Sequence, residues 1–261
     1  MSTTTLAAPI RVNTAGVHAR PGLGRLVAVE LRKIVDTRAG FWLQVATVAL
    51  AAAIVLVSLI IGDATDRTFA AVFDNAIQPA AVLLPVAGVL LVTSEWSQRT
   101  GLITFALVPV RSRVLGAKLL ASIVLAVAML AATAAIVAAG VLVASPGAEG
   151  TWTDAGMLIA QTTVFLTAGM VTAAAFGAIL LASAPALVAL FALPSAWMGV
   201  VSMSYFSDIA PWVDTARALS PMHEEVMNAT QWAHAGSALV IWMVIPLAIG
   251  VWRITRREVT I

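Results

Sequence analysis

Residues 94–118, SEWSQRTGLITFALVPVRSRVLGAK, separate two long apolar segments. Four of the 15 lysines and arginines lie in this short stretch, although 61% of the chain is hydrophobic and only 11% is charged. A basic interruption between apolar runs is typical of a loop that joins two membrane-spanning helices at the membrane surface. The stretch therefore predicts a pair of spans, and the same pattern of apolar runs extends along the chain.

The composition places the chain among integral membrane proteins. Its mean hydropathy is +0.97, and apolar runs near the bilayer-spanning length of about 20 residues recur along its 261 residues. A soluble domain with this composition would lack the polar surface that keeps it in solution. Cysteine is absent, which excludes disulfides, thiolate metal ligands and cysteine nucleophiles. We expect one membrane domain at 21–261 after a disordered cytoplasmic tail at 1–20.

The predicted fold class is an all-α integral membrane protein with six transmembrane helices. The spans are expected at about residues 41–61, 76–94, 119–144, 156–182, 186–205 and 236–252. Span 2 contains Pro79 and Pro85, so a kink or a bent start is expected. A long extracellular connection occupies 206–235. Alanines spaced four apart in span 3, at Ala131, Ala135 and Ala139, predict close helix packing there.

An amphipathic helix is predicted at 21–38, before the first span. Apolar residues recur there at helical spacing, with basic residues beside them. The residues expected to contact lipid are Arg25, Leu26, Leu31, Arg32 and Lys33. Such a helix lies in the interface plane with its basic groups toward anionic headgroups. The alternative is a solvated cap on the first span.

Charge placement predicts the orientation. If the N-terminus is cytoplasmic, only Arg67 and Arg217 of the 15 lysines and arginines fall in outer loops. This asymmetry is a strong positive-inside signal. We expect a multi-pass protein of the plasma membrane with both termini in the cytoplasm, and residues 94–118 then lie on the cytoplasmic side.

Several function classes are disfavoured. The expected spans carry no ionisable side chain away from their ends, which weighs against proton-coupled transport and ion pumping. No HExxH, GxSxG or GxxxxGK[ST] motif occurs. The segment around His223 is interpreted as a solvated loop face rather than a metal site. We therefore expect no catalytic residue, no bound metal or cofactor, and no nucleic-acid partner.

Residues 95–113 predict a turn through a short cytoplasmic helix. Glu95 and Arg99 are spaced to pair on a helix, Thr100 can cap a new one, and Pro109 ends it. The short helix is apolar and is flanked by basic residues: Leu102, Ile103, Phe105 and Leu107, then Arg111 and Arg113. An apolar patch with a charged rim suggests a docking site for another protein. Packing of these residues on the chain's own helix ends is the alternative.

This pattern resembles the signature of type-2 ABC transporter permeases. Glu95, Thr100, Pro109, Arg113 and Lys118 resemble E-x-x-x-G-T, a short apolar helix, and P-x-x-R followed by a lysine. The chain departs from that pattern at Arg99, where glycine is usual. The layout is similar as well: an amphipathic helix, six spans, a cytoplasmic helix between spans 2 and 3, and a long connection before span 6.

The resemblance implies the membrane subunit of an ATP-driven exporter. Two permease copies, identical or related, would pair with two copies of a separate ABC ATPase, which would bind ATP and magnesium. The segment around residues 100–107 would be the coupling helix seated in the ATPase. An amphipathic drug, peptide or lipid would move outward along a path near Phe191, Trp197 and Met198. The alternatives are a stand-alone channel or facilitator, and a membrane enzyme without a recognisable motif.

Overall fold

The computed structural model describes residues 22–63, 67–97, 111–145, 149–201 and 203–256, and every regular element within these ranges is helical. Five described helices are each long and apolar enough to cross a bilayer, and a sixth crossing is made by three consecutive elements. The five are α2 (Arg38–Ile61), α3 (Phe69–Ser97), α5 (Arg111–Ala144), α6 (Ala155–Leu180) and α7 (Ser183–Val201). The sixth joins α11 (Ala229–Leu239), the π-helical turn η3 (Val240–Val244) and α12 (Ile245–Arg256).

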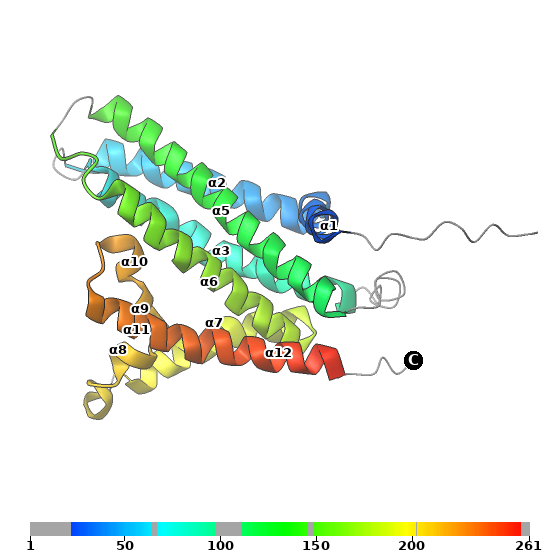
Figure 1. Cartoon of the computed structure of the whole chain (residues 1–261). Helices are drawn as coiled ribbons and strands as arrows, with labels where there is room; N and C mark the ends of the chain where they lie inside the picture. Colours follow the sequence, from blue (N-terminus) through cyan, green and yellow to red (C-terminus); the bar gives the residue numbers. More distant parts are fainter. Residues whose placement is uncertain (1–21, 64–66, 98–110, 146–148, 202, 257–261) are drawn as a thin grey trace, which may run out of the picture.

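The spanning helices form one bundle with α3 and α6 in the middle. Helices α2 and α5 lie along one side of this pair, while α7 and the α11–α12 span lie along the other (Figure 1). Helix α1 (Leu23–Asp36) packs across α5, α2 and α3 at what we call the α1 end of the bundle. The opposite end, which we call the α10 end, carries η2 (Ser204–Phe206), α8 (Ala210–Val213), α9 (Thr215–Leu219) and α10 (Pro221–Glu224).

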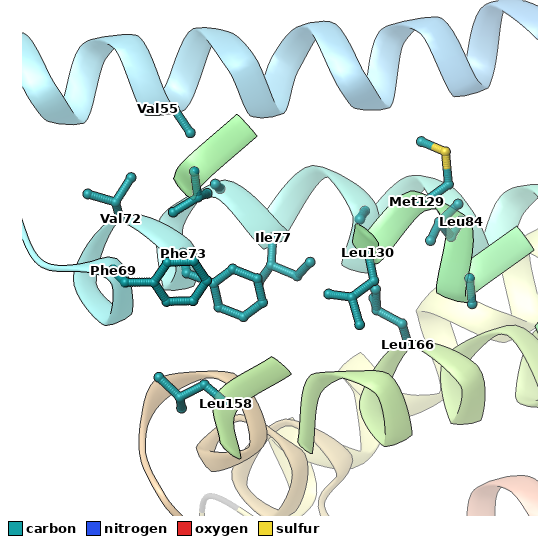
Figure 2. Close-up of a cluster of buried hydrophobic side chains, with 14 of the residues drawn as sticks. Val55, Phe69, Val72, Phe73, Ile77, Leu84, Met129, Leu130, Leu158 and Leu166 are labelled. Atoms are coloured by element: carbon teal, nitrogen blue, oxygen red, sulfur yellow. The ribbon is translucent and has the colours of Figure 1, made fainter. Parts of the chain in front are cut away.

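The largest core fills the half of the bundle toward the α10 end. Figure 2 shows side chains of α2, α3, α5 and α6 converging there, with Phe69 and Phe73 stacked at a centroid distance of 5.2 Å. Phe73, Ile77 and Leu84 are fully buried on the face of α3 turned to this cluster. Because the lipid tails outside are as apolar as this core, dense packing rather than water exclusion holds such helices together.

Glycines and alanines let the central helices approach closely. A Cβ on Gly88 of α3 would lie 3.1 Å from Ala173 Cβ of α6, and one on Gly250 of α12 would lie 2.8 Å from Ala178 Cβ. The small residues predicted to pack in span 3 behave differently, since Ala131, Ala135 and Ala139 are exposed in the single chain. That prediction was wrong for this chain's own contacts. In this part of α5 the buried residues are Thr133, Val137 and Val141, while the buried alanines lie earlier, at Ala117, Ala121 and Ala126.

Several predicted boundaries differ from the structure; among them, α5 begins at Arg111 rather than 119 and α7 ends at Val201 rather than 205. Helix α3 begins at Phe69 rather than near residue 76. At this start the Thr68 hydroxyl accepts a hydrogen bond from the Ala71 amide. The last span begins at Ala229 rather than 236, because Asn228 and Gln231 form a capping box. The turn expected at 183–185 lies at 181–182 instead, where Leu181 adopts a positive φ of 56° and ends α6.

Candidate functional site

Four charged side chains from three helices meet at the α1 end. Lys118 of α5 donates from Nζ to Glu30 Oε2 of α1 at 2.8 Å, and Lys33 of α1 donates to Glu95 Oε1 of α3 at 2.8 Å. Lys33 also contacts Glu30 at 2.7 Å, and Lys118 lies 3.4 Å from Glu95. We call these residues the Glu30–Lys118 cluster. Two carboxylates and two ammonium groups make its formal charge zero.

The cluster is largely buried. The side chains of Glu30, Glu95 and Lys118 are 6%, 6% and 4% exposed, whereas that of Lys33 is 40% exposed. Lys118 Nζ also donates a hydrogen bond to the backbone oxygen of Leu91, 2.8 Å away. Buried charges are tolerated only when they are paired and hydrogen-bonded, as these are. The cluster therefore fixes the position of α1 against the ends of α3 and α5.

Local sequence explains how the three helices supply these groups. Glu30 and Lys33 are three residues apart and so share one face of α1. The same face carries Ile34, which is buried against Leu91 and Ala121. An apolar contact thus lies beside the ion pairs and shields them from water, which strengthens their attraction.

Lys33 is held in its charged form. Burial alone would lower the pKa of Lys33, but hydrogen bonds and charge attraction from Glu30 and Glu95 outweigh it, so the pKa is raised above its usual 10.5. The ammonium therefore persists throughout the physiological pH range.

The residues predicted for ATPase coupling are described only in part. Glu95 lies in the cluster, and Arg113 is half-buried near the start of α5. Helix α5 begins at Arg111, whose side chain lies outside the description. Also outside the described residues are Arg99, Thr100, Leu102, Ile103, Phe105, Leu107 and Pro109.

The residues predicted to contact lipid on α1 divide into two groups. Arg25 and Arg32 are exposed, while Leu26 is half-buried and Leu31 packs on the cluster of Ile34, Leu91 and Ala121. Lys33 was predicted to face headgroups, but it turns inward to two carboxylates. Sequence reasoning missed Glu30, and the Glu30–Lys33 spacing, typical of an ion pair on one helix face, was the signal that could have found it.

The connection at the α10 end docks on α6 through buried polar groups. Gln161 donates from Nε2 to the Glu225 backbone oxygen at 2.7 Å and accepts from the Met227 amide at 3.0 Å. His223 is buried, with Nδ1 2.7 Å from Asp74 Oδ1 of α3. The interpretation of this segment as a solvated loop face was therefore wrong for Met222 and His223, which are buried, whereas Glu224 and Glu225 are exposed. Its turns are anchored because Gln161 satisfies two backbone groups that would otherwise be buried without partners.

An apolar cavity of about 250 Å³ lies between α3, α6, α7, α9 and the last span. Phe191, predicted on the substrate path, lines it. Trp197 and Met198 do not line this cavity, and both are exposed on α7. The predicted path residues thus face two environments, the cavity and the outer surface of the bundle.

Among the residues that the structure describes, no group of three or more histidine, cysteine, aspartate or glutamate side chains could hold a metal ion. The described charged residues of the spanning helices lie near the helix ends.

Comparison of the sequence with protein-family models and with curated proteins found no match to either. The architecture itself defines the class: an all-α, multi-pass membrane protein with six segments long and apolar enough to span a bilayer. Helix α1 lies at one end of these segments, and the α8–α10 connection lies at the other.

Proposed function

We propose that this chain is the membrane subunit of an ATP-driven exporter of the type-2 ABC class, with its ATP-binding subunits in separate chains. The observation that carries the proposal is the Glu30–Lys118 cluster. Glu95 precedes the predicted coupling segment at the end of α3, and Lys118 follows it near the start of α5. Both are bonded to α1, so a force applied to the segment would act on three helices together.

Mechanical coupling needs such rigid attachment. An ATPase seated on residues 100–107 would push on the ends of α3 and α5. Because a buried ion pair joins α5 to α1 and a partly buried one joins α3 to α1, the helices would move as one unit rather than separately. This is the behaviour expected of a subunit driven by a partner instead of by its own chemistry.

The charge distribution supports a cytoplasmic α1 end. Among the described lysines and arginines, only Arg67 and Arg217 belong to the α10 end. Exposed Arg25 and Arg32 on α1 suit contact with anionic headgroups of the inner leaflet. The proposed orientation puts residues 98–110 in the cytoplasm, within reach of an ATPase.

The working assembly would contain two permease copies and two ATPase subunits, and the latter would supply ATP and magnesium. The substrate would be amphipathic, since the cavity beside Phe191 is mostly apolar and no charged side chain lines it. Plasma-membrane localisation with both termini inside follows from the same proposal.

The test is co-purification with an ABC ATPase encoded beside this chain. Residues 100–107 are replaced by a Gly-Ser linker of equal length, and the matched control replaces residues 145–149 at the α10 end. We expect the parent and the control to retain the ATPase and the first variant to lose it while keeping its elution volume in size-exclusion chromatography. If the parent binds no ATPase, the chain is better described as a stand-alone channel or facilitator.

A further inference from the structure

The cavity beside α7 has walls that are mostly apolar and carry no ionisable side chain. Phe165, Leu190, Phe191 and Trp242 supply much of the surface, and Thr172, Ser195 and Thr215 supply the side-chain polar groups. The Ser195 hydroxyl already donates to the Phe191 oxygen at 2.7 Å, and the Trp242 indole N–H donates to the Val213 oxygen at 2.8 Å. A ligand here meets apolar surface and few side-chain donors.

Two prolines add hydrogen-bond acceptors to this wall. Pro85 in α3 and Pro194 in α7 have no N–H, so the carbonyls four residues earlier, at Ala81 and Leu190, lose their regular helical donors. Ala81 and Pro85 both line the cavity, as do Leu190 and Pro194. A helical carbonyl points along the axis toward the residue four positions later. Because both residues of each pair line the cavity, we expect each released carbonyl on the cavity face of its helix.

The two released carbonyls come from different helices and border one apolar space. In a bilayer no water replaces a missing donor cheaply, and an unsatisfied carbonyl is costly. A hydroxyl or N–H group placed between α3 and α7 would relieve that cost, which an acyl chain without donors cannot do.

We propose that this cavity binds a small lipophilic molecule carrying a hydroxyl or N–H donor, with its apolar body against Phe191 and Trp242 and its donor on the Ala81 or Leu190 carbonyl. An apolar cavity of about 150 Å³ accommodates benzene, so one of about 250 Å³ suits a body of about ten non-hydrogen atoms. If the chain is the proposed permease, this is a contact site for its substrate. Binding by the chain itself requires no ATPase and is tested without one.

The probes are 3-bromo-4-butylphenol and its methyl ether, which share a bromobutylphenyl body; in the ether a methyl group replaces the donor hydrogen. Bromine quenches tryptophan fluorescence on contact, and Trp242 lines the cavity. Quenching is measured with the full chain in lipid nanodiscs. The variant Trp242→Phe identifies the fraction of the fluorescence quenching that comes from the Trp242 indole. We expect saturable quenching, with the phenol binding about fivefold tighter than the ether, as one net hydrogen bond predicts.

The first test of whether the probe binds in this cavity is to fill the cavity with a larger side chain. Gly169 lines it, and an added Cβ would meet only Pro85 Cγ at 3.8 Å, so the side chain of Gly169→Leu extends into the space. Gly156→Leu makes the same change in the same helix, where a Cβ meets nothing within 4 Å. We expect Gly169→Leu to remove saturable quenching and Gly156→Leu to keep it. Ala81→Leu fills the facing wall and replaces Gly169→Leu if that variant does not fold.

Restoring a backbone donor tests the role of the carbonyls. Pro194→Ala returns an N–H to the Leu190 carbonyl without adding bulk, and Pro79→Ala makes the same change in α3 away from the cavity. We expect Pro194→Ala, or Pro85→Ala if the donor binds the Ala81 carbonyl, to narrow the preference for the phenol at least twofold, and Pro79→Ala to leave it unchanged. Quenching that is unsaturable and equal in parent and Gly169→Leu would show bilayer partitioning only. Equal affinity for phenol and ether would overturn donor recognition.

Discussion

Lys118 Nζ lies 2.8 Å from Glu30 Oε2, across 88 positions of sequence, and both side chains are almost completely buried. This contact joins the first described helix to the start of α5. Glu95 and Lys118 flank the predicted coupling segment in the sequence, so the stability of this end and the proposed transmission of force depend on the same few atoms.

Removal of the buried ammonium should destabilise the bundle. Lys118→Met leaves Glu30 and Glu95 without their buried partner, and breaking one side of such a pair costs about 3 kcal/mol. Arg32→Met, on the exposed face of α1, should cost less than about 0.5 kcal/mol. Unfolding in mixed detergent micelles measures both variants. Equal stabilities for the two would contradict the packing described for α1.

A double-mutant cycle separates the interaction energy between Glu30 and Lys118 from the other effects of each substitution. Glu30→Gln and Lys118→Met combined should destabilise by less than the sum of the single variants, by about 1 kcal/mol or more. Strict additivity would mean that the two residues do not interact in the membrane.

The pH dependence of the Lys33 contact has a defined sign. The pKa of Lys33 is raised in the folded chain by Glu30 and Glu95, so its contribution is complete below the unfolded value of 10.5 and is lost as pH rises through the folded value. The stability difference between the parent and Lys33→Met should stay constant up to mildly alkaline pH and shrink above 10.5. Melting temperatures across this range test it, and a difference that has already vanished at neutral pH would contradict it.

Gln161 should control how firmly the α10 connection docks. Gln161→Leu keeps the approximate size but leaves the Glu225 carbonyl and the Met227 amide without this partner, at a cost of about 3 kcal/mol. Amide exchange in residues 221–231 should accelerate. The control is Thr163→Val, because the Thr163 hydroxyl bonds within its own helix to Ile159 and so should leave exchange there unchanged.

Gly250 marks a helix contact too close for a side chain. A Cβ there would lie 2.8 Å from Ala178 Cβ and 3.2 Å from the Ala175 oxygen, so Gly250→Ala should cost about 1–3 kcal/mol. Gly236→Ala meets nothing within 4 Å and should stabilise the same span by about 0.5–1 kcal/mol. Opposite shifts of the melting temperature are expected, and two shifts of the same sign would refute this packing.

Sequence alone predicted the six crossings because apolar length is a local property that survives folding. It could not predict the Glu30–Lys118 cluster, since the partners come from three helices and each looks like an ordinary boundary charge. Burial of His223 was missed for a similar reason, because Asp74 and Phe165 supply its surroundings from other elements. By contrast, the start of the last span was readable from Asn228 and Gln231, a local capping signal.

The central claim is that an ABC ATPase docks on the segment between α3 and α5. A photoreactive phenylalanine analogue at position 105 tests this in living cells, with the same analogue at Leu142, exposed at the other end of α5, as the control. We expect a light-dependent crosslink from position 105 to an ABC ATPase and none from position 142. Absence of any ATPase adduct at position 105, with the chain at normal levels in the membrane, would contradict it.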